Sequence, residues 1–162
     1  MSDAEHRPRS PARATAREQR DAFLATSAVR AGIRPTKQFP RVFGVVVDWR
    51  LGLRHVTSVA ALCDGAAQLI ARSGSLAAGA QDDDVRGAAR LLVASADWYY
   101  AEAAPTKDFR YPGRGRVRFY LMTYDGVRFI EAERGAATGA HGRYAELYDV
   151  AKRIASGLLR GG

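Results

Sequence analysis

The chain has 162 residues, of which 47% are hydrophobic and 26% charged, and its net charge is +8. This length and composition fit one globular core and exclude two full-sized domains. No apolar stretch reaches the roughly 20 residues that cross a bilayer, so no contact with a membrane is expected. The single cysteine, Cys63, cannot form an internal disulfide, and residues 1–20 lack the apolar region of a secretory signal. We therefore expect a cytoplasmic protein.

Residues 1–37 form a basic segment with eight basic and four acidic residues. Prolines and small residues near its start predict a largely disordered tail, because little apolar surface is available to offset the entropy of ordering. Apolar residues between Thr15 and Ala31 allow a short amphipathic helix that Gly32 and Pro35 would end. The expected organisation is therefore an arginine-rich tail over residues 1–37 and one α+β domain over residues 38–162.

Three strands are predicted next, over residues 41–49, 55–63 and 66–72. The first is a short run of valine and phenylalanine, which is typical of a buried strand. The pair Asp64-Gly65 lies between the second and third strands and favours a type I′ turn, in which both central residues have positive φ. These segments predict an antiparallel meander, followed by a loop of small residues over 74–81.

A helix is predicted to begin at three consecutive aspartates, Asp82 to Asp84, because negative charge stabilises the first turn of a helix. Its apolar residues recur at steps of three and four, and Pro105 marks its expected end. A hairpin follows over residues 116–133, in which Asp125-Gly126 would form the loop and pair Tyr124 with Val127. The predicted core face of this hairpin consists of Val117, Phe119, Leu121, Ile130 and Ala132. A last amphipathic helix is predicted over residues 144–159.

This order of elements predicts an α+β fold with a five-stranded antiparallel sheet. A three-strand meander, a helix, a two-strand hairpin and a helix follow one another, with room for an extra N-terminal helix. Helices would cover one face of the sheet or both.

Two segments carry a resemblance to known proteins. The stretches Arg41-Val-Phe-Gly-Val-Val-Val-Asp-Trp49 and Gly115-Arg-Val-Arg-Phe-Tyr-Leu-Met-Thr-Tyr-Asp-Gly-Val-Arg128 resemble those of a family of small bacterial proteins without an assigned activity. In element order the chain is similar to roadblock and longin-type modules, which pack helices on a five-stranded antiparallel sheet, dimerise and bind small GTPases. It departs from roadblock modules in placing three strands before the helix and two after it. The resemblance implies an interaction module by analogy and transfers no site residue.

Residues 107–120 combine basic and aromatic side chains, which is the chemistry that holds phosphates and stacks bases. The same pattern fits a solvated loop that leads into an edge strand, with Arg118 paired to Glu133. The candidate nucleic-acid contacts in this segment are Lys107, Arg110, Arg114, Arg116 and Tyr120.

Trp98 and Tyr100 are candidate contacts for a protein partner, with core packing as the other interpretation. A pocket beside Asp48 and Trp49 would instead indicate an enzyme. The sequence contains no recognisable catalytic constellation, cofactor loop or metal-ligand spacing, so we assign no catalytic, cofactor or metal residue. We expect a non-enzymatic cytoplasmic interaction or regulatory module that self-associates or docks a protein. The alternative is a nucleic-acid-binding protein that uses residues 107–118 and the arginine-rich tail.

Overall fold

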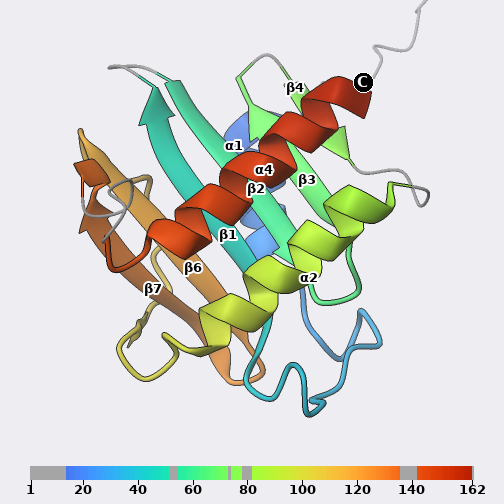
Figure 1. The fold of residues 1–162 in the computed structure, drawn as a ribbon. Coiled ribbons are helices and arrows are strands. Elements are labelled where there is room, and N and C mark those ends of the chain that lie inside the picture. Colours follow the sequence, from blue (N-terminus) through green and yellow to red (C-terminus); the bar gives the residue numbers. More distant parts are fainter. Residues whose placement is uncertain (1–13, 52–54, 73, 78–81, 136–141, 162) are drawn as a thin grey trace, which may run out of the picture.

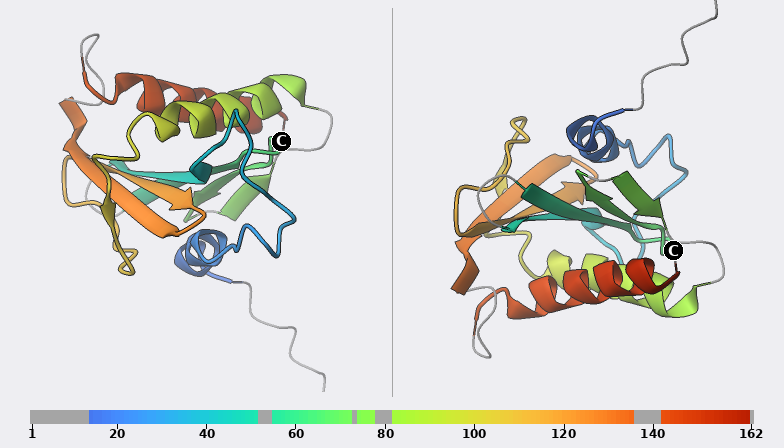
Figure 2. Two further views of the ribbon diagram at one scale, coloured as in Figure 1. Left: turned by 90° about the horizontal axis from the view of Figure 1, so that it is seen from below. Right: turned by 90° about the horizontal axis from the view of Figure 1, so that it is seen from above.

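The computed structural model describes residues 14–51, 55–72, 74–77, 82–135 and 142–161. One antiparallel sheet forms the middle layer, with its strands in the order β4-β3-β2-β1-β6-β7-β5. Helices α2 (Asp83–Asp97) and α4 (Ala145–Gly161) lie side by side on one face, and helix α1 (Ala16–Leu24) lies on the other (Figures 1 and 2). None of the helices described is long and apolar enough to cross a bilayer.

The sheet has seven strands, so the prediction of five was wrong in number. The five main strands agree with the expected segments; their bounds are β1 (Val42–Leu51), β2 (His55–Leu62), β3 (Ala67–Ala71), β6 (Arg116–Thr123) and β7 (Gly126–Glu133). The two additional strands are short and lie at the edges: β4 (Gly74–Ala77) within the predicted small-residue loop, and β5 (Ala104–Pro105). Short edge strands carry little hydrophobic pattern of their own, because only one neighbour orders them.

The turn between β2 and β3 differs from the prediction. Ala61 pairs with Ala67, and the amide of Leu62 donates to the carbonyl of Ala66, so the loop contains three residues. Among the described residues only glycines have positive φ; Gly65 is one of them and Asp64 is not. A type I′ turn is therefore excluded, and the register is shifted by one residue from the predicted one.

The register of the hairpin of β6 and β7 also differs from the predicted one, by two residues. Thr123 pairs with Gly126 and Tyr120 pairs with Phe129, so Tyr124 and Asp125 form the two-residue loop. Because side chains alternate with a period of two, this shift keeps every side chain on its predicted face. The expected core face is thus confirmed, whereas Arg118 lies opposite Glu131 instead of Glu133.

The main core lies between the sheet and the helices α2 and α4. It includes Val45, Val47, Phe119 and Leu121 from the central strands, and their side chains have no exposed surface. Helix α2 begins after Asp82, whose carboxylate accepts from the amide of Val85, as the run of aspartates predicts. It ends at Asp97, earlier than Pro105 suggested, and turns occupy the residues between.

A smaller core lies on the opposite face, beneath α1. Leu24 and Ala28 pack there with residues of the sheet, among them Val46, Tyr120 and Met122. The helix begins with a capping box in which Thr15 and Glu18 each accept from the other's amide. The helix that the sequence allows within residues 1–37 is therefore present, and it contributes to a core of the domain. Residues 1–13, and residues 78–81 of the predicted small-residue loop, lie outside the described residues.

Candidate functional site

The predicted nucleic-acid segment passes over the α1 side of the sheet before it enters β6 (Figure 2). Three of its aromatic side chains, those of Phe109, Phe119 and Tyr120, pack in or against the two cores. Tyr120 has no exposed surface, and the ring of Phe109 packs edge-on against it with the centroids 5.9 Å apart. Phe119 lies in the main core on the other face. Base stacking needs an accessible ring, so neither Tyr120 nor Phe119 can provide it in this conformation.

Several basic residues of the same segment have acidic partners. The guanidinium of Arg110 lies 2.6 Å from the carboxylate of Asp108, and Arg116 lies 3.5 Å from Glu131. Lys107 and Arg114 are exposed. The predicted contacts therefore do not form one surface. Lys107, Arg110 and Arg114 lie on the surface loop, whereas Tyr120 is part of the smaller core.

The structure places Trp98 and Tyr100 at the end of α2. Trp98 is 85% exposed, whereas Tyr100 is half-buried. Arg41 and Arg128 lie over the Tyr100 ring, with their guanidinium carbons 4.9 and 4.2 Å from its centroid. Tyr100 is thus held by cation–π contacts within the domain, and Trp98 is the residue of this pair that a partner can reach.

Trp98 belongs to a stripe on the solvent side of α2, which we call the α2 stripe. It consists of Gly87, Leu91, Ala94 and Trp98, which the 3.6-residue period of a helix brings onto one face. Leu91 is 43% exposed, and a Cβ built on Gly87 would meet no atom within 4 Å. This stripe alternates small and large residues; Gly87, Leu91 and Trp98 are exposed, whereas Ala94 is partly buried against the main core.

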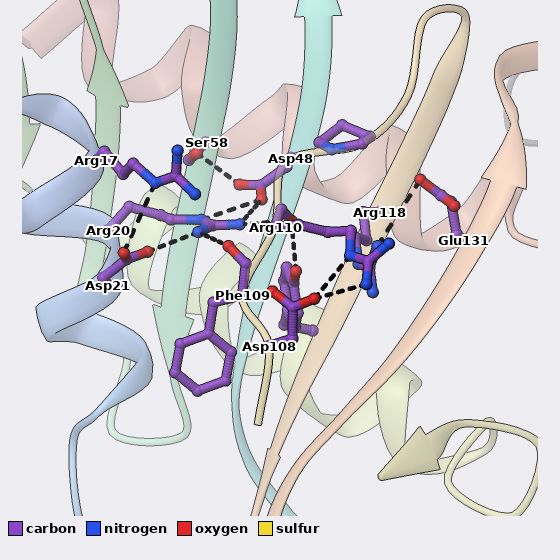
Figure 3. Close-up of polar contacts among 12 residues, drawn as sticks. Arg17, Arg20, Asp21, Asp48, Ser58, Asp108, Phe109, Arg110, Arg118 and Glu131 are labelled. Carbon is purple, nitrogen blue, oxygen red and sulfur yellow. Dashed lines mark hydrogen bonds and ion pairs between the residues drawn. The ribbon is translucent and has the colours of Figure 1, made fainter. Parts of the chain in front are cut away.

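A buried ion pair lies on the α1 face of the sheet. Arg20 of α1 and Asp48 of β1 have fully buried side chains, and Arg20 Nη2 lies 2.6 Å from Asp48 Oδ2 (Figure 3). The hydroxyl of Ser58 donates to Asp48 Oδ1 at 2.5 Å. Arg20 also donates to the carbonyls of Phe109 and Arg110. One guanidinium therefore joins α1, the central strand and the segment that precedes β6.

The ionisable groups around this pair are perturbed by burial. Desolvation raises the pKa of Asp48, against the opposing effect of Arg20 and Ser58. Desolvation likewise raises the pKa of Tyr120 to about 12. The Tyr120 hydroxyl is consequently protonated at neutral pH, and it donates to the carbonyl of Arg110 at 2.5 Å.

Asp48 and Trp49 do not share a pocket. Consecutive residues of a strand point to opposite faces, so Asp48 lies beneath α1 whereas Trp49 packs on the α4 side. There the indole meets the ring of Tyr148 edge-on, with the centroids 5.6 Å apart. The hypothesis of an enzyme pocket lined by both residues is thus contradicted by the alternation of the strand.

Arg20, a member of this ion pair, and the neighbouring Arg17 and Tyr111 were not predicted as site residues from the sequence. Their signal was indirect. An aspartate within the valine-rich β1 requires a buried partner. Thr15 followed by Glu18 is a capping-box pattern that could have indicated the start of the helix that supplies this partner. Which basic residue would reach Asp48 is set by tertiary contacts between positions 28 residues apart.

Within the part of the chain that the structure describes, no group of three or more His, Cys, Asp or Glu side chains is arranged to hold a metal ion. Comparison with known proteins finds no family model, no curated protein and no solved structure that matches the chain.

Proposed function

We propose that this protein is a non-enzymatic interaction module that self-associates through the α2 stripe. The observation that carries the proposal is Trp98, whose side chain is 85% exposed. Tryptophan has a large hydrophobic surface, and it is enriched at the centre of protein interfaces. A largely exposed indole on the same helix face as the exposed Leu91 therefore favours an interface over a solvated surface.

The pattern of the stripe supports a second copy of the chain as the partner. In an antiparallel pair of α2 helices related by a two-fold axis, Trp98 of each copy would lie over Gly87 of the other, and Leu91 over Ala94. Both contacts place a large residue on a small one, and each occurs twice because a two-fold interface is self-complementary. Large residues in the gaps above small ones allow close helix packing.

Gly87 adds an independent argument. A glycine inside a helix costs about 1 kcal/mol relative to alanine. No neighbour in the domain requires it, because the space beside its Cα is open. In the proposed dimer that space accommodates the indole of the partner, which would explain a glycine at this position.

Sedimentation velocity of the full chain over a range of concentrations tests the proposal. We expect a dimer, and we expect Trp98→Ala to weaken it about thirtyfold or more, as for a central interface tryptophan. Val29→Ala is the matched control, because Val29 is 86% exposed but lies outside the α2 stripe. A monomeric wild-type protein, or equal dissociation constants for Trp98→Ala and Val29→Ala, would contradict the proposal.

A further inference from the structure

A cavity of about 420 Å³ opens beside the first turn of α1, on the face of the sheet opposite to the α2 stripe. We call it the arginine cavity. Three arginines line it from three different elements: Arg17 from α1, Arg50 from β1, and Arg72, which follows β3. Thr15, Ala16, Val56 and Tyr111 complete the lining.

The sheet register explains why Arg50 and Arg72 lie on the same face of the sheet. Arg50 pairs with Val56 across β1 and β2, and Asp48 pairs with Ser58 one step further along the same face. Ser58 in turn pairs with Ile70 of β3, so Arg72 falls two residues beyond Ile70 on this face. The arginine cavity therefore lies on the same face of the sheet as the buried Arg20–Asp48 pair, two residues further along β1.

Two arginines of this cavity, Arg17 and Arg72, lie farther from the carboxylates of the described residues than several other arginines of the chain do. Arg41, Arg110 and Arg143 each lie within 2.9 Å of a carboxylate. No carboxylate is among the described residues that line the arginine cavity. Arg17 lies 4.0 Å from Asp21, and Arg72 makes no hydrogen bond or ion pair to any described residue.

Two lining residues are held in place by the domain. Arg50 Nε donates to the carbonyl of Pro112 at 2.7 Å, which fixes its guanidinium at the rim. The ring of Tyr111 packs against two guanidinium groups, with the carbons of Arg17 and Arg20 at 5.3 and 4.5 Å from its centroid. Burial raises the pKa of Tyr111, so its hydroxyl is a neutral donor at physiological pH.

We propose that the arginine cavity binds the phosphate of a small phosphomonoester. Arginine is always charged, and its planar donors match phosphate oxygens in pairs. A phosphomonoester carries a charge near −2 at neutral pH, which suits a cavity lined by three arginines better than a single diester charge does. The volume is within the range of small-ligand sites, whereas an extended strand would need a longer groove. This site is separate from the α2 stripe and does not depend on self-association.

Calorimetric titration of the full chain with inorganic phosphate, and with adenosine monophosphate beside adenosine, tests the proposal in a phosphate-free buffer. We expect both phosphates to bind and adenosine to fail. Arg72→Gln and Arg17→Gln should each weaken binding about tenfold or more, the loss expected for one charge-assisted hydrogen bond. Arg30→Gln removes the same charge outside the cavity and should change the dissociation constant less than about twofold.

Thermal unfolding of each variant shows whether it remains folded. Absence of phosphate binding by the folded wild-type protein would overturn the proposal, as would equal losses in Arg72→Gln and Arg30→Gln. A single-stranded oligonucleotide is titrated into the same proteins as a further ligand. If it binds and depends on Arg72 while adenosine monophosphate does not bind, the ligand is a nucleic-acid backbone and the phosphomonoester assignment is wrong.

Discussion

The two faces of the sheet are stabilised by different kinds of interaction. The face beneath α2 and α4 is an apolar core of valine, leucine, alanine and aromatic residues. The face beneath α1 has a smaller apolar cluster, which gives way to a row of charged and polar side chains that includes Asp48, Ser58 and Arg118. The first face depends on the fit of side chains, and the second depends on a few specific charge pairs.

This difference determines how each face responds to substitution. Apolar packing can relax in part when one side chain is shortened, so its losses are graded. A buried charge that loses its partner has no such relaxation, and its desolvation is left uncompensated. Substitutions on the two faces should therefore differ in how much unfolding free energy they cost. They should also differ in whether a second substitution restores it.

The largest loss is expected for Arg20→Met. This change leaves Asp48 buried without its cation, which typically costs about 3–5 kcal/mol of unfolding free energy. Denaturant unfolding measures it. Arg17→Met, on the exposed side of the same helix, is the control and should have a small effect.

The double variant Arg20→Met with Asp48→Leu identifies the cause of that loss. Replacing both charges with apolar groups removes the desolvation penalty, so the double variant should be more stable than Arg20→Met alone. If the double variant loses as much stability as Arg20→Met and Asp48→Leu lose together, the ion pair does not hold α1 on the sheet.

A smaller loss is expected for Gly157→Ala between α4 and α2. A Cβ at Gly157 would lie 2.7 Å from Val85 Cγ2, so the two helices must separate slightly. Such overpacking costs about 1–3 kcal/mol. Gly87→Ala is the matched comparison, because the space there is open and the helix gains about 1 kcal/mol in propensity. Unfolding should be measured at concentrations where the chain is monomeric; losses of equal size in both variants would argue against this packing.

The smallest effect is expected for Tyr120→Phe, and it depends on pH. At neutral pH the variant loses the hydrogen bond to the Arg110 carbonyl, worth about 1 kcal/mol. The pKa of Tyr120 is raised to about 12 in the folded protein, whereas the unfolded chain ionises near pH 10. The stability due to its proton is therefore complete below about pH 10 and is lost as the pH rises towards 12. Unfolding from pH 8 to 11 should show the wild-type advantage shrinking, and a constant difference would contradict the assignment.

The same contrast explains what could be predicted from sequence. The core side of β6 and β7 follows from alternation, which survives a register error of two residues, as Phe119 and Leu121 show. The predicted turns and their registers were wrong because an Asp-Gly pair is compatible with more than one loop length. Asp64, for example, does not have the positive φ that a type I′ turn requires. The short strands β4 and β5 are ordered by their neighbours in the sheet and carry no pattern of their own.

The candidate sites were predicted less well, because they depend on contacts between distant residues. Basic and aromatic residues around Tyr120 indicated a binding surface, yet the rings of Phe119 and Tyr120 are both buried, because a core covers each face of the sheet. The arginine cavity combines Arg17, Arg50 and Arg72 from three elements, and no local pattern connects them. Of the two predicted contacts for a protein partner, Trp98 is exposed and Tyr100 is half-buried.

Self-association through the α2 stripe is tested most directly by the mass of Gly87→Gln in solution, measured together with its unfolding free energy under dilute conditions. Glutamine is a better helix former than glycine, so the monomer should be at least as stable as the wild-type monomer. The same side chain would fill the space above Gly87 that the partner's Trp98 occupies in the proposed dimer. We predict a well-folded protein that sediments as a monomer at concentrations where the wild type is a dimer. A Gly87→Gln protein that dimerises as tightly as the wild type would contradict the account.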